Sequence, residues 1–249
     1  MLLVHGLGAH SDRWEFLADF FRQNKIRSYA LELKGFGQTK DLPGHIDSFK
    51  IYDKDIRRLY NIITQENPGQ KIVLVGESMG GLIGFRFVSA NSGMFAGLIC
   101  ISPAFEGRPQ FSALEYIKIL SALIYNPKKQ FKMPFSPEMC TRDVEYQKVM
   151  YADYEKDRLA SAKTMINIFQ AQIQARILKS QIKIPVLFLL AGTDKVVNAQ
   201  ISANVFKRLT AEDKLIIKYP KMYHALSLDL GREKVFMDIL KWIRDRFKP

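Results

Sequence analysis

The feature that most constrains this chain is a short apolar run that leads directly into a glycine-rich turn carrying a serine. Residues 71–75 read Lys-Ile-Val-Leu-Val, which is typical of a buried β-strand. Gly76-Glu-Ser-Met-Gly80 follows, and an apolar, helix-like segment continues from Leu82. A G-x-S-x-G pattern between a strand and a helix presents a nucleophilic serine, although glycine-rich turns also match it by chance. The context therefore predicts Ser78 as a nucleophile.

Strand and helix patterns alternate along both flanks of this turn. Strands are expected at residues 2–4, 27–33, 71–75, 97–102, 184–190 and 214–219, and helices from near Ser11 and at 49–65, 199–209 and 233–246. Such alternation predicts an α/β fold: a mostly parallel sheet with helices on both faces. Ligands bind beyond the carboxyl ends of parallel strands, and Ser78 lies at such an end.

The alternation stops between residues 106 and 181. This stretch shows no clear strand pattern, a connector with two prolines, and a long amphipathic segment at about 160–178. We therefore predict a core formed by residues 1–105 and 182–249, with a helical cap inserted at 106–181. The apolar residues of the insertion would line a pocket beneath the cap, pack its helices on the core, or do both. They are Phe111, Leu114, Tyr116, Ile117, Leu120, Leu123, Ile124 and Tyr125.

Two further strand ends supply the groups that a serine nucleophile needs. A hydroxyl is activated by an adjacent base, normally a histidine that is oriented by a carboxylate. His224 follows the last expected strand and Asp194 follows the strand before it, so both should open at the same sheet edge as Ser78. Either residue alone would pass for an ordinary loop residue. Three strand ends in the order serine, acid, histidine predict a catalytic triad.

Backbone N–H groups beside Ser78 would stabilise the oxyanion of an acyl-transfer reaction. We expect one from Met79, directly after the nucleophile, and the other from Leu7 in the loop that follows the first strand. His5, at the start of that loop, is interpreted as a structural hydrogen-bonding residue. His10 is expected to be exposed.

Composition restricts the class of protein further. The chain is 47% hydrophobic and 25% charged, as in ordinary globular domains, and no apolar run approaches the roughly 18 residues that span a bilayer. Two cysteines, Cys100 and Cys140, form no disulfide framework, and the first N-terminal residues do not read as a signal peptide. These observations predict a reducing, cytoplasmic setting, and the apolar strand pattern around Cys100 predicts a buried free thiol there.

The net charge of +12 raises the question of acidic partners. Basic residues are spread along the whole chain without a cluster that interleaves aromatics, so we expect no nucleic acid partner. A lysine-rich solvated surface explains most of the charge. Peripheral attraction to anionic membranes, at about 1 kcal/mol for each well-placed cation, is the weaker functional interpretation.

Taken together, these segments resemble the α/β-hydrolase superfamily and, within it, the monoacylglycerol lipase and lysophospholipase-like group of serine hydrolases. The resemblance is carried nearly end to end by residues 5–14, 35–37, 44–49, 76–81, 191–197 and 223–224. It implies Ser78, Asp194 and His224 as the triad, and Leu7 and Met79 as the oxyanion donors. It also implies hydrolysis of single-chain carboxylic esters through an acyl-enzyme, an apolar acyl tunnel beneath a mobile cap, and no cofactor or metal.

Two other functions stay open at this point. An aminopeptidase of the same superfamily would need carboxylates in the cap to hold a substrate amine. Glutamates are available there: Glu106, Glu115, Glu138, Glu145 and Glu155. A non-catalytic binding protein on a hydrolase scaffold would be expected to have a broken triad, whereas this one is intact. Acyl-chain length and head group are not encoded in any motif.

The resembling group usually has two strands before the strand that starts here at residue 2. Without them, the strand at 27–33 would lie at or near an edge of the sheet, and an unprotected edge invites pairing with another chain. We therefore expect this edge to be covered either by an upstream segment or by a partner, including a second copy of the chain.

Overall fold

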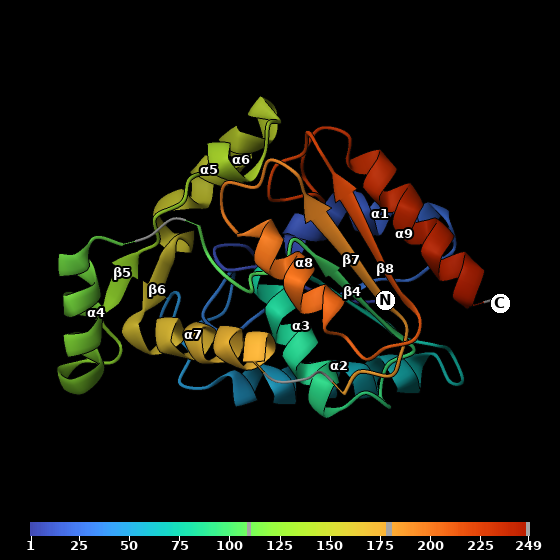
Figure 1. The fold of residues 1–249 in the computed structure, drawn as a ribbon, viewed down its shortest axis with the longest axis horizontal. Helices are drawn as coiled ribbons and strands as arrows, with labels where there is room; N and C mark the ends of the chain where they lie inside the picture. The colour runs from blue at the N-terminus through green and yellow to red at the C-terminus, as the bar shows by residue number, and fades with distance from the viewer. Residues whose placement is uncertain (109–110, 178–180, 248–249) are drawn as a thin grey trace.

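A six-stranded parallel sheet forms the centre of the molecule (Figure 1). The structure is a computed structural model that describes residues 1–108, 111–177 and 181–247, with backbone only for 153–157. The strands are β1 (Leu2–Val4), β2 (Tyr29–Leu31), β3 (Val73–Glu77), β4 (Gly97–Ile101), β7 (Val186–Ala191) and β8 (Lys214–Tyr219). They lie in the order β2-β1-β3-β4-β7-β8, and each neighbouring pair is parallel. The predicted α/β fold is confirmed.

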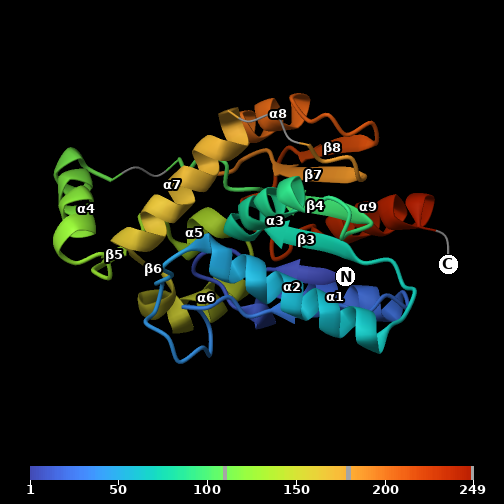
Figure 2. The ribbon, with the colours of Figure 1, turned by 90° about the horizontal axis from the view of Figure 1, so that it is seen from below.

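Helices cover both faces of this sheet, as Figure 2 shows. On one side pack α1 (Glu15–Gln23) and α9 (Arg232–Arg246). The other side carries α2 (Phe49–Glu66), α3 (Met79–Ala90) and α8 (Ala199–Lys207). Successive strand residues face opposite layers: Leu74 packs with α2 and α3, whereas Val75 packs with α1 and α9. Both faces are therefore apolar, which explains why the strands read as continuous apolar runs.

Two elements near the N-terminus differ from the prediction. The strand expected at 27–33 is shorter, Tyr29–Leu31, and lies at the edge of the sheet, where the sequence places it. The helix expected near Ser11 begins as a 3-10 turn, η1 (Ser11–Trp14), before α1. In that turn the N–H and hydroxyl of Ser11 both donate to the Glu32 carboxylate, which connects the turn to the segment after β2.

Between β4 and β7, the described residues form four helices and a small second sheet. The helices are α4 (Ala113–Tyr125), α5 (Pro137–Cys140), α6 (Val144–Asp157) and α7 (Ala162–Ile177). Strands β5 (Gln130–Lys132) and β6 (Leu159–Ser161) pair antiparallel, so the expectation of no strands here is wrong. Three-residue strands are too short to give a recognisable alternation. The predicted end of the amphipathic segment, Leu178, lies outside the described residues. The division into core and cap stays a prediction.

Helix α4 presents its apolar side chains to solvent. Its buried residues are Ile119 and Ala122. Six large apolar side chains of the same helix are between 45% and 89% exposed: Leu114, Tyr116, Ile117, Leu120, Ile124 and Tyr125. The interpretation that these residues pack a helix on the core is therefore wrong, and Figures 1 and 2 both show α4 at the outer end of the molecule. Within the described ranges, no helix combines the length and apolarity needed to cross a membrane.

Candidate active site

Ser78 occupies a strained turn between β3 and α3. Its φ of 56° lies in a region that non-glycine residues rarely adopt, and such strain is concentrated at functional sites. The Ser78 N–H donates to the Ile101 carbonyl at 2.9 Å, which fixes the turn against β4. A Cβ at Gly80 would lie 2.0 Å from the Val4 carbonyl oxygen, so only glycine allows α3 to approach β1 this closely. The backbone has the geometry of a nucleophile elbow.

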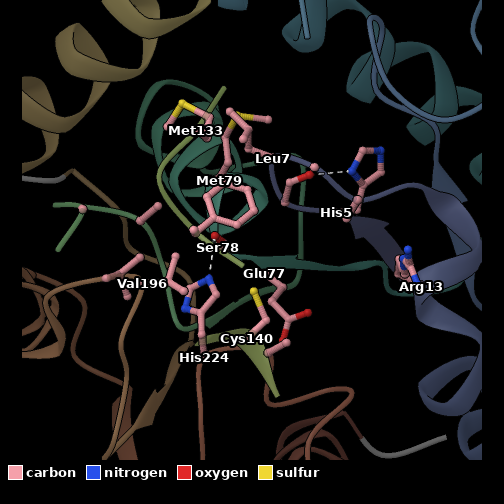
Figure 3. A pocket seen from close by; sticks show the side chains of 18 of the residues that line it. His5, Leu7, Arg13, Glu77, Ser78, Met79, Met133, Cys140, Val196 and His224 are labelled. Atoms are coloured by element: carbon pink, nitrogen blue, oxygen red, sulfur yellow. Dashed lines mark hydrogen bonds between the residues drawn. The ribbon is translucent and has the colours of Figure 1, made fainter. Parts of the chain in front are cut away.

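The three predicted triad residues meet at the carboxyl edge of the sheet, and Figure 3 shows two of them, His224 and Ser78, facing each other. His224 Nε2 lies 2.8 Å from Ser78 Oγ, and His224 Nδ1 lies 2.9 Å from Asp194 Oδ2. The other Asp194 oxygen accepts from the N–H groups of Val196 and Val197, each at 2.8 Å. A carboxylate held in this way orients the imidazole with Nδ1 as donor, so that Nε2 can accept the proton of Ser78.

Burial and neighbouring charges shift the pKa values of Asp194 and His224 in opposite directions. Burial disfavours the ionised form of Asp194, but the adjacent imidazole, its hydrogen bond and the two backbone donors hold the carboxyl pKa below its ordinary value. Burial likewise works against the imidazolium of His224. The charge and hydrogen bond of Asp194, with the charge of Glu77, outweigh it and raise the pKa of His224. The site therefore favours an imidazolium beside a carboxylate, the charge state that proton transfer from a serine creates.

The backbone around Leu7 and Met79 lies beside the serine in the same cavity. Met79 is the first residue of α3, so its N–H has no acceptor within the helix. A Cβ at Gly6 would lie 3.0 Å from Ser78 Cβ, and glycine therefore lets the loop that carries Leu7 approach the nucleophile. Both predicted donors are next to Ser78, and their role in stabilising an oxyanion stays a prediction.

The two histidines of the first loop differ in environment. His5 is buried, its Nδ1 lies 2.8 Å from the Gly6 carbonyl, and its Nε2 accepts from the Leu33 N–H at 3.0 Å. Both ring nitrogens are thus engaged with the backbone, and the interpretation of His5 as structural support is confirmed. The expectation that His10 is exposed is wrong, because its side chain is 19% exposed and lies 3.8 Å from the Asp12 carboxylate.

A cavity of about 150 Å³ opens above Ser78. Its core side includes Trp14, Val196 and Leu228. Apolar residues from the segment between β4 and β7 close the other side: Met133, Pro134, Phe135, Met150 and Ile168. Two charged residues that the sequence did not single out, Arg13 and Glu77, also line it. Among the described residues, no group of three or more His, Cys, Asp or Glu side chains is arranged to hold a metal ion.

Known proteins are similar to this chain in sequence and in fold. The family model described as "Serine aminopeptidase, S33" (Hydrolase_4) matches residues 1–231. The chain belongs to the Hydrolase_4 family. It is 26% identical to human monoglyceride lipase over 99% of this chain and 82% of the relative, and 24% identical to phospholipase YtpA of Bacillus subtilis over 95% and 91%. The structure of Paleococcus ferrophilus monoacylglycerol lipase superimposes with a TM-score of 0.89, at 25% identity, over 98% of this chain and 93% of that one. This Hydrolase_4 member is a hydrolase of the esterase and lipase class.

Four of the five glutamates that could have held a substrate amine lie away from the cavity. Glu106 binds Arg176 and Asn198, Glu115 caps α4 through Ser112, Glu138 accepts from Tyr151, and Glu145 pairs with Lys148. None of these four lines the cavity, and the side chain of Glu155 is not among those described. The carboxylate that does line it, Glu77, precedes the serine in the G-x-S-x-G pattern. Because Glu77 is adjacent to the nucleophile in the sequence, that position could have identified it as a residue of the site.

Proposed function

We propose that this chain is a serine hydrolase that cleaves carboxylic esters carrying a single acyl chain, with monoacylglycerols or lysophospholipids as substrates. The observation that carries the proposal is the continuous hydrogen-bonded chain from Asp194 through His224 to Ser78 Oγ. The names of two relatives, monoglyceride lipase and phospholipase, support the substrate class.

The chemistry follows from the positions of these atoms. Ser78 Oγ attacks the ester carbonyl while His224 Nε2 accepts its proton, and Asp194 stabilises the resulting imidazolium. The oxyanion accepts hydrogen bonds from the N–H groups of Leu7 and Met79. His224 then returns the proton to the departing alcohol, which leaves the acyl group on Ser78. Water attacks this acyl-enzyme with His224 again as base, and the free acid is released.

The acyl chain is assigned to the apolar cavity between the core and the proposed cap at 106–181. The cavity volume of about 150 Å³ lies below the roughly 300–1,000 Å³ of most ligand sites, so a long chain requires the cap to shift. Each buried methylene contributes about 0.8 kcal/mol, and kcat/KM for p-nitrophenyl esters should therefore rise with chain length until the cavity is filled.

Replacing the nucleophile tests the proposal directly. Ser78→Ala should lower kcat on p-nitrophenyl esters by about a million-fold, as loss of the serine does in a serine protease. A fluorophosphonate probe should label the native protein and not this variant. Ser89→Ala, which removes another hydroxyl from the same stretch, where it bonds the Phe85 carbonyl, serves as the matched control and should retain native activity. Native rates in Ser78→Ala protein contradict the proposal.

Aminopeptidase activity, which the family description names, is not favoured by the cavity. A substrate ammonium would meet the Arg13 guanidinium, which lines the cavity and is buried. The Glu77 carboxylate already accepts two hydrogen bonds from Ser227. Aminoacyl-naphthylamides should therefore be cleaved far more slowly than esters, and comparable rates for the two substrates would reverse this assignment.

We also propose that helix α4 makes peripheral contact with anionic membranes. Its apolar residues Ile117, Leu120 and Ile124 are 63%, 59% and 89% exposed, and exposed lysines accompany them: Lys118, Lys128 and Lys129. Apolar insertion and cation attraction together favour an anionic lipid surface. The combined variant Ile117→Ser, Leu120→Ser and Ile124→Ser should lose cosedimentation with phosphatidylserine vesicles and keep its rate on a short soluble ester. Unchanged vesicle binding contradicts this contact.

Two remaining sequence predictions belong to the same proposal, namely a cytoplasmic location and pairing of the sheet edge with a second copy. Strand β2 lies at the edge of the sheet, where unpaired backbone groups can accept another strand. Sedimentation velocity over a range of protein concentrations tests the pairing, and a constant monomer mass excludes it.

A further inference from the structure

A buried carboxylate connects the nucleophile strand to the loop that carries the histidine. Glu77 is the last residue of β3 and directly precedes Ser78. The N–H of Ser227 donates to Glu77 Oε1 at 3.1 Å, and the Ser227 hydroxyl donates to Oε2 at 2.7 Å. Ser227 follows His224 by three residues and is itself buried. Two hydrogen bonds therefore join the residue beside the nucleophile to the turn after the base.

Other contacts fix the same loop from different directions. The Tyr223 N–H donates to Asp229 Oδ2 at 2.7 Å, within the loop, and the Ala225 N–H donates to the Cys140 carbonyl at 2.9 Å, in α5. The two hydrogen bonds to Glu77 connect this loop to β3. Proton transfer requires His224 Nε2 to stay within hydrogen-bonding distance of Ser78 Oγ. The bonds between Glu77 and Ser227 connect the strand that ends beside Ser78 to the loop that carries His224, and so they help to set this distance.

We infer that Glu77 and Ser227 are positioning residues, whose paired hydrogen bonds hold the His224 loop in register with Ser78. The inference rests on the proposed function, since it assigns a task relative to the proposed triad. Burying a carboxylate is costly unless hydrogen bonds satisfy it, and here each carboxylate oxygen has a donor from Ser227. Figure 3 shows Glu77 lining the cavity that Ser78 and His224 also line.

Burial raises the pKa of Glu77, and in its ionised form this carboxylate adds negative charge beside the imidazole. Together with Asp194 it raises the pKa of His224 against the effect of burial. Titratable groups that interact with Glu77 are His224, Asp194, Cys140 of α5 and Tyr146 of α6, and the charged Arg13 of η1 lines the same cavity. Burial raises the pKa of Cys140 to about 12 and that of Tyr146 above its ordinary value, so neither titrates together with His224. Removal of the Glu77 charge should therefore lower the pKa of His224.

Two variants separate the hydrogen bonds from the charge. Ser227→Ala removes the hydroxyl donor and should lower kcat on a short ester by about 10- to 100-fold with KM unchanged, the size expected for a misplaced catalytic group. Glu77→Gln keeps an acceptor for the Ser227 N–H, offers an amide N–H that the Ser227 hydroxyl can accept, and removes the charge. It should lower kcat less, and should move the acid limb of the kcat/KM profile to lower pH. The double variant should lose no more than Ser227→Ala, because both changes act on one contact.

The matched control is Ser202→Ala. Ser202 is also a buried serine, but its hydroxyl donates to the backbone carbonyl of Pro103 at 3.0 Å, and neither residue lines the cavity. This control should lower the melting temperature without changing kcat. Native kcat in folded Ser227→Ala protein overturns the inference. If Ser227→Ala does not fold, Glu77→Gln decides, and native kcat in the folded Glu77→Gln protein overturns the inference. The proposed function is tested separately, because it fails only if Ser78→Ala protein keeps native activity.

Discussion

The carboxyl edge of the sheet and the outer helix α4 distribute their side chains in opposite ways. At the edge, ionisable groups are buried: Asp194 is 4% and His224 5% exposed. On α4, Ile124 is 89% exposed. Buried polar groups require partners within the protein, and the bonds that Asp194 accepts from His224, Val196 and Val197 supply them. Clustered exposed apolar groups instead indicate contact with something outside the chain.

This difference separates the chemistry of the protein from its contact with an outside surface. The chemistry at the sheet edge depends on contacts within the chain, so substitutions there should change rate or folding in any assay. The surface of α4 contributes little to either, so substitutions there should be visible only when a partner surface is present. Four experiments test this difference between the sheet edge and the surface of α4, and they follow in order from the largest expected effect to the smallest.

Changing the base or its orienting acid should have the largest effect. His224→Ala should lower kcat on a short ester by about a million-fold, and Asp194→Asn by about ten-thousand-fold because asparagine favours the wrong imidazole tautomer. Steady-state kinetics on folded protein measure both. His10→Ala, at the partly buried histidine of the first loop, is the control and should stay close to native. An Asp194→Asn enzyme within tenfold of the native rate would break the contrast.

Closing the space behind the nucleophile should disrupt folding. A methyl group at Gly80 would meet the Val4 carbonyl oxygen at 2.0 Å, and neither backbone can move without separating α3 from β1. We expect Gly80→Ala to destabilise the protein by about 4 kcal/mol or more. At Gly93 a Cβ would meet nothing within 4 Å, so Gly93→Ala should stay within about 0.5 kcal/mol of native. Urea denaturation compares the two, and equal stabilities would contradict the steric account.

Two isoleucines of α4 give a matched comparison within one helix. Ile119 is 7% exposed and packs among buried residues, whereas Ile124 is 89% exposed. Ile119→Ala should cost about 2–4 kcal/mol of unfolding free energy, and Ile124→Ala less than about 0.5 kcal/mol. Chemical denaturation measures both. A cost for Ile124→Ala as large as that for Ile119→Ala would show that the exposed face is packed after all.

The pH dependence should show the smallest effect. His224 must be neutral to act as base, and its pKa is raised above the ordinary 6.5 by Asp194 and Glu77. The acid limb of kcat/KM should therefore have its midpoint above pH 6.5. The same shift stabilises the fold, fully below the ordinary pKa of 6.5, and this gain is lost as pH rises through the folded-state pKa. A kinetic midpoint below pH 6.5 would contradict the charge balance at the sheet edge.

Local patterns in the sequence were sufficient for the fold class and for the candidate residues at the site. The apolar run before Gly76 and the helix after Met79 identified the elbow. Since the carboxyl ends of parallel strands meet at one edge, the positions of Asp194 and His224 after later strands placed them beside Ser78, although Ser78 and His224 are 146 residues apart. Strand β2 at the sheet edge followed from the same reasoning.

Tertiary structure alone decided what packs against what. The apolar residues of α4 read as a core-facing or pocket-facing set, and only the fold shows them exposed. Strands β5 and β6 are too short to show a pattern, and the contact of Glu77 with Ser227 joins residues 150 positions apart. Periodicity reports which residues share a face of an element, not which partner covers that face. Burial and long-range hydrogen bonds depend on how separate segments meet in space.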